Sequence, residues 1–93
     1  MDNNQRNRLR AEGQSIDATI QVGKGGVSTG IVDELDAQLK RNHLVKVRLQ
    51  RGAAGGDKVS EIGIAEELAA TLGAEIVERR GHTILLYRRK KMA

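Results

Sequence analysis

The sequence predicts a single α/β domain in which two long helices lie on one face of a four-stranded mixed sheet. Its 93 residues can bury one hydrophobic core and are too few for two. Strand-like segments alternate with segments of helical spacing in the order αβαβαββ. Because β–α–β crossovers are right-handed, two in succession put both long helices on the same face. We therefore expect residues 1–93 to form one two-layer domain.

The N-terminal segment is polar, and between Met1 and Arg10 only Met1 and Leu9 are apolar. It predicts a short, frayed helix over about residues 4–12, with residues 1–8 as a loose tail. The first strand follows at about residues 18–22, where apolar and polar side chains alternate.

Two long helices are predicted from apolar stripes. The first covers residues 29–42, has Ser28 as its N-cap, and carries a stripe at Ile31, Val32, Leu35 and Leu39. The second covers residues 58–72, from an N-cap at Asp57 to a terminating Gly73. We assign its stripe to Val59, Ile62, Ala65, Ala69 and Leu72.

The remaining strands are predicted at residues 44–49, 75–79 and 83–87, with a tight turn at Arg80-Gly81 joining the last two. The unbroken run Ile84-Leu85-Leu86 is typical of a central strand that is covered on both faces. The first three strands are expected to be parallel and the fourth antiparallel. Loops 23–26 and 52–56 and the hairpin tip at 79–82 then share one edge of the sheet, and the basic tail lies at the opposite edge.

The loop Gly23-Lys24-Gly25-Gly26 joins the first strand to the first long helix. Glycines allow another molecule to approach the main chain, and free N–H groups of a first helical turn favour anions. With Ser28 at the helix start, this junction predicts a phosphate-binding edge. Simple turn geometry is the alternative interpretation. The spacing matches neither a P-loop nor a dinucleotide fingerprint.

The chain has a net charge of +4, and its positive charge is concentrated at the C-terminal end. Residues 78–93 hold six basic residues and one acidic residue. This asymmetry favours a polyanionic partner, nucleic acid before membrane, although a merely solvated tail is the alternative. The tail, residues 89–93, is expected to be loose. Tyr87 is the only aromatic residue, so contacts to phosphates and structured RNA are favoured over base stacking. We expect the electrostatic contacts from Arg51, Arg79, Arg80, Arg88, Arg89 and Lys90.

Catalytic and metal-binding patterns are absent from the sequence. There is no Cys, and His43 and His82 have no sequence neighbours that would complete a metal or catalytic set. No apolar run approaches 18 residues and no signal peptide is visible. We therefore expect that the protein is not an enzyme and that it has no cofactor, metal, membrane or small-molecule partner. We expect a cytoplasmic location.

The run Ile20-Gln21-Val22-Gly23-Lys24-Gly25-Gly26-Val27-Ser28-Thr29-Gly30-Ile31 resembles the signature of the CRM domain, the domain of YhbY-like RNA-binding proteins. Gly81 and Leu86-Tyr87-Arg88 are similar to that family's last hairpin, so the resemblance covers about residues 9–90. The chain departs from the family in its Arg- and Asn-rich first helix and in its lack of proline. The packing of that helix is therefore left open.

The resemblance implies a sheet of strand order one-two-four-three, similar to the C-terminal domain of translation initiation factor three. It also implies RNA contact through the G-x-x-G loop, here Gly23 to Gly26, by analogy with KH domains. Stand-alone family members are linked to precursor large ribosomal subunits, and plant multi-domain members to group II intron splicing. Gly81-His82-Thr83 looks like the hairpin of an archaeal stand-alone member.

The resulting hypothesis is an RNA-binding protein that binds structured ribosomal RNA and acts in large-subunit assembly. Two alternatives remain open at this point. A protein-docking module would use the open face of the sheet. A small-anion or nucleotide binder would use the glycine loop alone.

Overall fold

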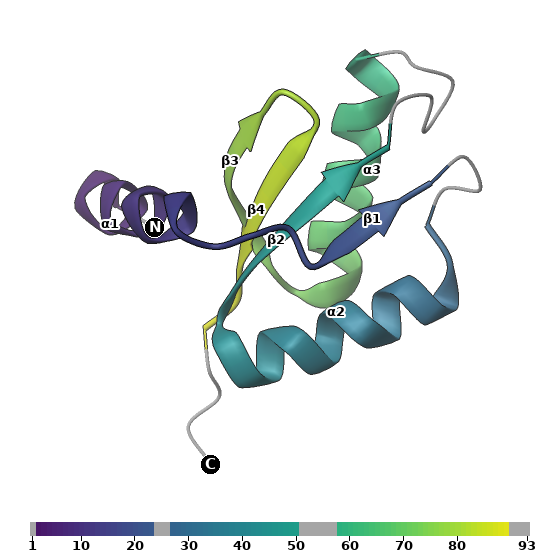
Figure 1. The fold of residues 1–93 in the computed structure, drawn as a ribbon, viewed down its shortest axis with the longest axis horizontal. Coiled ribbons are helices and arrows are strands. Elements are labelled where there is room, and N and C mark those ends of the chain that lie inside the picture. Colours follow the sequence, from purple (N-terminus) through teal and green to yellow (C-terminus); the bar gives the residue numbers. More distant parts are fainter. Residues whose placement is uncertain (1, 24–26, 51–57, 90–93) are drawn as a thin grey trace.

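The computed structural model describes residues 2–23, 27–50 and 58–89, without the side chains of residues 58–61 (Figure 1). The elements are α1 (Asn3–Gln14), β1 (Ile20–Val22), α2 (Thr29–Asn42), β2 (Leu44–Leu49), α3 (Lys58–Leu72), β3 (Glu75–Arg80) and β4 (Thr83–Tyr87). The predicted bounds of both long helices, β2 and β4 are confirmed. Strand β1 is shorter than predicted and begins at Ile20, and β3 extends one residue further, to Arg80.

The sheet has the order β1-β2-β4-β3, as predicted. Strand β1 pairs with β2 in parallel, and β4 pairs antiparallel with both β2 and β3. The central position of β4 explains its unbroken apolar run, because Ile84 and Leu86 face one core cluster and Leu85 faces another. Gly81, with φ of 59°, supplies the left-handed conformation that the β3–β4 turn requires.

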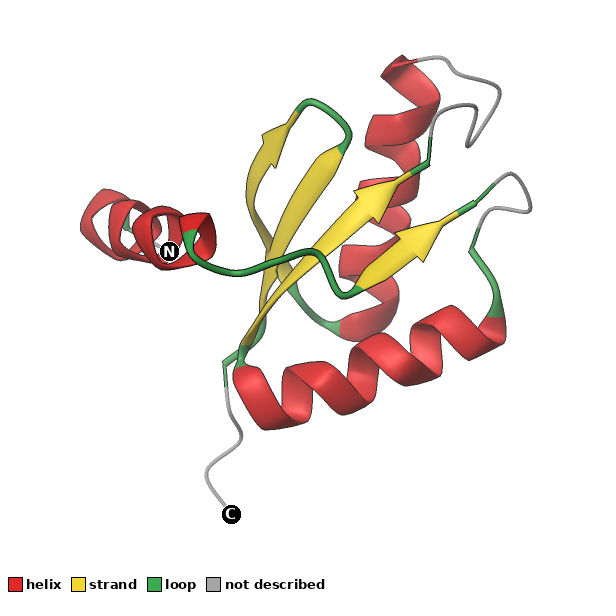
Figure 2. Ribbon diagram, viewed as in Figure 1, coloured by secondary structure: helices red, strands yellow, loops and turns green. Residues whose placement is uncertain are grey.

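Helices α2 and α3 cover the same face of the sheet and enclose the main core (Figure 2). Leu35 and Leu39 of α2 are buried there, which confirms the stripe predicted for that helix. The stripe predicted for α3 is partly wrong, because Ile62 is 38% exposed whereas Leu68 is fully buried. Apolar residues occur on several sides of α3, so its sequence alone allows more than one orientation. Contacts with the sheet and with α2 select the face that carries Ile64, Ala65, Leu68 and Leu72.

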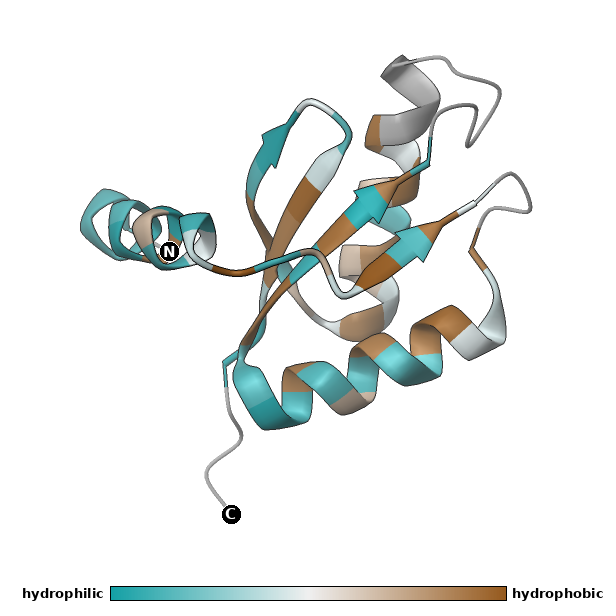
Figure 3. Cartoon of the chain, in the orientation of Figure 1, coloured by the Kyte–Doolittle hydropathy of each residue, from teal (hydrophilic) through white to brown (hydrophobic). Residues whose placement is uncertain are grey.

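Helix α1 lies on the opposite face of the sheet, although most of its surface is hydrophilic (Figure 3). Its one large buried side chain, Leu9, packs with Leu44, Val77 and Leu85 in a second, smaller cluster. Gly13 is also buried, and a Cβ added there would lie 2.5 Å from a methyl carbon of Leu85. The close approach of α1 to the sheet therefore depends on this glycine.

The position of α1 corrects one expectation and adds to another. Residues 3–8 are helical instead of forming a loose tail, because Asp2 caps the helix by accepting a hydrogen bond from the Gln5 backbone N–H (2.7 Å) and Leu9 anchors it. The two predicted layers are present, but α1 adds a partial third layer. Within the described residues, no helix is both long enough and apolar enough to cross a bilayer.

Candidate functional site

Three segments that are distant in the sequence meet at one edge of the sheet. The backbone N–H of Gln50, just after β2, donates to the carbonyl of Val22 at the end of β1 (2.8 Å). The N–H of Leu49 donates to the carbonyl of His82 in the β3–β4 turn (2.6 Å). The ends of β1 and β2 are therefore tied to each other and to the hairpin tip, as predicted from the topology. Arg88 follows β4 at the other end of the sheet, where its backbone N–H donates to the carbonyl of His43 (2.9 Å).

Only the residues that flank the centre of the glycine loop belong to the described structure, Gly23 on one side and residues 27–28 on the other. Lys24, Gly25 and Gly26 lie outside the described residues. Gly23 is half-buried, and a Cβ added there would lie 2.9 Å from the Gln50 side-chain oxygen. At the other end, Ser28 caps α2, as predicted, by accepting a hydrogen bond from the Ile31 N–H (3.3 Å).

The first turn of α2 is accessible from this edge. Thr29 and Gly30 are exposed, and N–H groups at these positions of a helix have no intrahelical acceptor. The positive end of the helix dipole adds to their attraction for an anion. These N–H groups can thus donate hydrogen bonds to a phosphate oxygen beside the end of β1.

Arg79 and Arg80 carry positive charge to the same edge. Both are exposed at the end of β3, next to the turn that Leu49 holds in place. Within residues 2–23, 27–50 and 58–89, no ion pair engages either guanidinium. Both side chains are therefore available to a polyanion. Arg51 and Lys90, predicted to act with them, lie outside the described residues.

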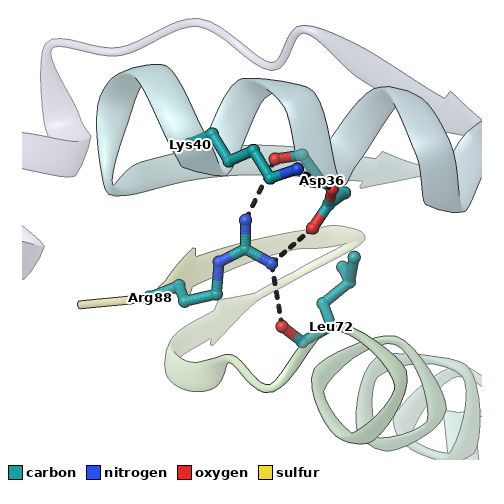
Figure 4. Close-up of polar contacts among 4 residues, drawn as sticks. All are labelled: Asp36, Lys40, Leu72 and Arg88. Carbon is teal, nitrogen blue, oxygen red and sulfur yellow. Dashed lines mark hydrogen bonds and ion pairs between the residues drawn. The ribbon is translucent and has the colours of Figure 1, made fainter. Parts of the chain in front are cut away.

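Arg88 is placed differently from the other predicted cations (Figure 4). Its Nη1 donates to the Asp36 carboxylate (2.7 Å) and to the Leu72 carbonyl (3.0 Å), and its Nη2 donates to the Asp36 carbonyl (3.0 Å). The side chain is only 20% exposed. Arg88, expected as an RNA contact, is thus committed to joining β4, α2 and α3 at the edge opposite the glycine loop. Arg89, the next residue, is exposed.

The Arg88 cluster changes the pKa of Asp36. The hydrogen bond from Arg88, together with one from Lys40 (3.1 Å), holds the pKa of the Asp36 carboxyl below its usual value. The carboxylate therefore stays ionised into mildly acidic solution and continues to bind Arg88 there.

The single aromatic residue of the chain, Tyr87, is half-buried and contacts Gln5 and His43. The hydroxyl of Tyr87 accepts a hydrogen bond from the Gln5 side chain (3.4 Å), and its ring meets His43 edge to face at 6.0 Å. His43 in turn lies 3.6 Å from the Glu12 carboxylate. Across the part of the chain that the structure describes, no group of three His, Asp or Glu side chains could hold a metal ion.

Comparison with known proteins is consistent across sequence and structure. A family model described as the CRS1/YhbY (CRM) domain matches residues 1–88. The Methanocaldococcus jannaschii protein named "Probable RNA-binding protein" is 39% identical over 80 residues, which are 86% of this chain and 58% of that protein. The chain therefore spans little more than half the length of this relative.

Two bacterial proteins are similar over nearly the whole chain. "Probable RNA-binding protein YqeI" of Bacillus subtilis is 28% identical over 87 residues, 94% of this chain and 86% of that protein. The solution structure of a Staphylococcus aureus protein, described as a candidate RNA-binding protein, superposes with a TM-score of 0.81 at 27% identity. That match covers 99% of this chain and 92% of the other.

Proposed function

The chain belongs to the CRS1/YhbY (CRM) domain family, and from this premise we propose that it binds structured ribosomal RNA during assembly of the large ribosomal subunit. The observation that carries the proposal is the edge where the exposed first turn of α2 lies beside the hairpin that presents Arg79 and Arg80. RNA binding is also the activity for which both curated relatives described above are named. The loop from Gly23 to Gly26 would lie against the RNA backbone, with Ser28 holding the helix start in place.

Recognition at this edge would depend on the RNA backbone. The groups that face outward are N–H donors and guanidinium groups, which suit phosphate oxygens and sugar hydroxyls. Tyr87 is half-buried against His43 and Gln5 and lies beside Leu44, at the other end of the sheet, so it provides no stacking platform at this edge. We propose that the protein acts by binding, without catalysis, and that it does so in the cytoplasm.

A protein-docking role receives less support from the fold. It needs an open sheet face, and α1 covers part of the face that α2 and α3 leave free. The remainder of that face is polar and basic, which suits a nucleic acid better than an apolar protein surface.

The first test is crosslinking in cells followed by sequencing of the bound RNA. Enrichment of large-subunit ribosomal RNA or its precursors is expected. Recovery of unrelated messenger RNAs in the same proportion as their abundance would refute the ribosomal assignment.

The second test is Gly25→Asp, measured by binding to the recovered RNA and by thermal melting. A carboxylate in this loop is expected to repel phosphate and weaken binding at least tenfold, because both charge and access change. Ala70→Asp is the matched control, since it adds the same charge at an exposed site near the end of α3. Unchanged RNA affinity in Gly25→Asp would remove the glycine loop from the interface, and a collapsed melting transition would assign the glycine to turn geometry.

A further inference from the structure

One row of polar side chains crosses all four strands on the face opposite α2 and α3. In the strand register, Gln21 of β1 lies beside Arg48 of β2, Arg48 beside Thr83 of β4, and Thr83 beside Arg80 of β3. Their chain neighbours Val22, Val47 and Ile84 point into the main core, so the row points the other way. Gln21, Arg48 and Arg80 are exposed and Thr83 is half-exposed. This polar row begins at the edge that holds the glycine loop.

The next row of outward-facing residues contains one more cation, Lys46, and lies where α1 begins to cover the sheet. Lys46 lies beside Leu85, and Leu85 beside Glu78. Lys46, Arg80 and Thr83 line a hollow whose wall is the C-terminal end of α1, at Gly13 and Gln14. Helix α1 thus covers the apolar cluster around Leu85 and leaves the polar row uncovered.

The charges on this surface do not cancel. Glu78, which lies in the same row as Lys46, is paired with Arg10 of α1 at 3.3 Å. Glu12 of α1, which lines a second hollow with Lys46, lies 3.6 Å from His43. Among the residues that the structure describes, no ion pair engages Arg48, Arg80 or Lys46. Exposed Arg48 and Arg80 and half-buried Lys46 are therefore not neutralised within the described residues, whereas both acids near them are already paired. Such a surface attracts a polyanion.

We propose that this outer sheet face, carried by Lys46, Arg48, Thr83 and Arg80, is a second RNA-binding surface continuous with the glycine-loop edge. Arg48 and Arg80 stand two strands apart, roughly 10 Å, which lets two long side chains contact one segment of RNA backbone. The Thr83 hydroxyl and the Gln21 amide lie in the same row and can bond to sugar 2′-hydroxyls, which DNA lacks. The RNA would then pass from the loop edge across the sheet toward α1. This inference rests on the RNA-binding function proposed above.

The test compares two double variants that each remove one Lys and one Arg charge. Lys46→Gln/Arg48→Gln removes the charge of β2, and Lys40→Gln/Arg41→Gln removes exposed charge from the end of α2, which packs on the other face. The probes are a labelled RNA hairpin and a DNA hairpin of the same sequence, titrated at several salt concentrations. Melting curves accompany both variants. Arg48→Gln alone is the fallback if the change at half-buried Lys46 lowers stability, because Arg48 is exposed.

Each lost phosphate contact should reduce the slope of log affinity against log salt by about 0.7–0.9, and weaken binding about four- to fivefold at physiological salt. The β2 variant should therefore lose roughly 15- to 30-fold in RNA affinity and about 1.4–1.8 in slope, and the α2 variant should match the wild type. Wild-type protein should also prefer the RNA hairpin to the DNA hairpin.

The outcomes separate this inference from the proposed function. If the wild type binds the RNA hairpin and the β2 variant binds like the α2 variant, the sheet face is not an RNA surface and the loop edge alone remains. If the wild type binds RNA and DNA equally and the β2 variant loses both equally, the face is a general polyanion surface and its assignment to RNA is wrong. If the wild type binds no RNA at any salt concentration, the proposed function itself fails.

Discussion

Replacing Leu68 with alanine is expected to destabilise the protein far more than replacing Ile62 with alanine. Both residues are large aliphatic side chains on α3, so each change shortens a side chain in the same helix. They differ in environment, because Leu68 is 0% exposed and Ile62 is 38% exposed. The pair therefore tests which face of α3 is packed against the sheet.

The magnitudes follow from burial. Leu68→Ala removes side-chain atoms from the main core and leaves a cavity, which costs about 3–5 kcal/mol in the free energy of unfolding. Ile62→Ala loses only part of the burial of one aliphatic side chain, and alanine regains a few tenths of a kcal/mol in helix propensity, so a net cost below about 1.5 kcal/mol is expected. At about 4–8 °C per kcal/mol for a domain of this size, Leu68→Ala should melt at least about 12 °C lower than the wild type.

Urea denaturation followed by far-ultraviolet circular dichroism provides the assay. The slope of unfolding free energy against urea should be the same for all three proteins, so that the midpoints report stability directly. Equal losses of stability in the two variants, or a larger loss in Ile62→Ala, would mean that α3 buries Ile62, as the stripe predicted from the sequence has it. The packing described for the main core would then be wrong.

Three further outcomes concern α1, the Arg88 cluster and the tail. Gly13→Val should loosen α1 from the sheet, at a cost of about 1–3 kcal/mol, because the added carbons collide with buried Leu85; wild-type protection of the α1 amides in hydrogen exchange would contradict this. Since Arg88 lowers the pKa of Asp36 in the folded protein, this pair stabilises the fold above the unfolded-state value of about 4 and ceases to do so as pH falls through the lower folded value. Arg88→Met should reduce the loss of unfolding free energy at acidic pH, measured by urea titrations at successive pH values. An unchanged loss would show that the pair does not contribute. Deleting residues 89–93 removes three positive charges and should lower the salt slope of RNA binding by about 2–3 if all three touch phosphate, equally for cognate and unrelated RNA; lost discrimination with an unchanged slope would make the tail a specific reader.

The candidate site was predictable where local pattern decides it. Ser28 precedes an apolar helical stripe, and it caps α2 as the pattern indicates. Arg79 and Arg80 adjoin a glycine turn, and both are exposed at the hairpin as expected. Lys46 and Arg48 alternate with apolar residues along β2, a pattern that indicates one shared, solvated strand face. Their alignment with Arg80 depends on the strand order, which this alternation does not contain.

The sequence by itself determined the order and bounds of most elements, because caps, alternating strands and helical stripes depend on residues a few positions apart. Only the tertiary structure decided the rest. It paired Arg88 with an aspartate 52 residues away and removed that arginine from the free cations. It turned α3 to bury Leu68, and it laid α1 over the second face of the sheet. Each of these choices follows from contacts between distant segments, whose free energies appear only when the whole chain has packed.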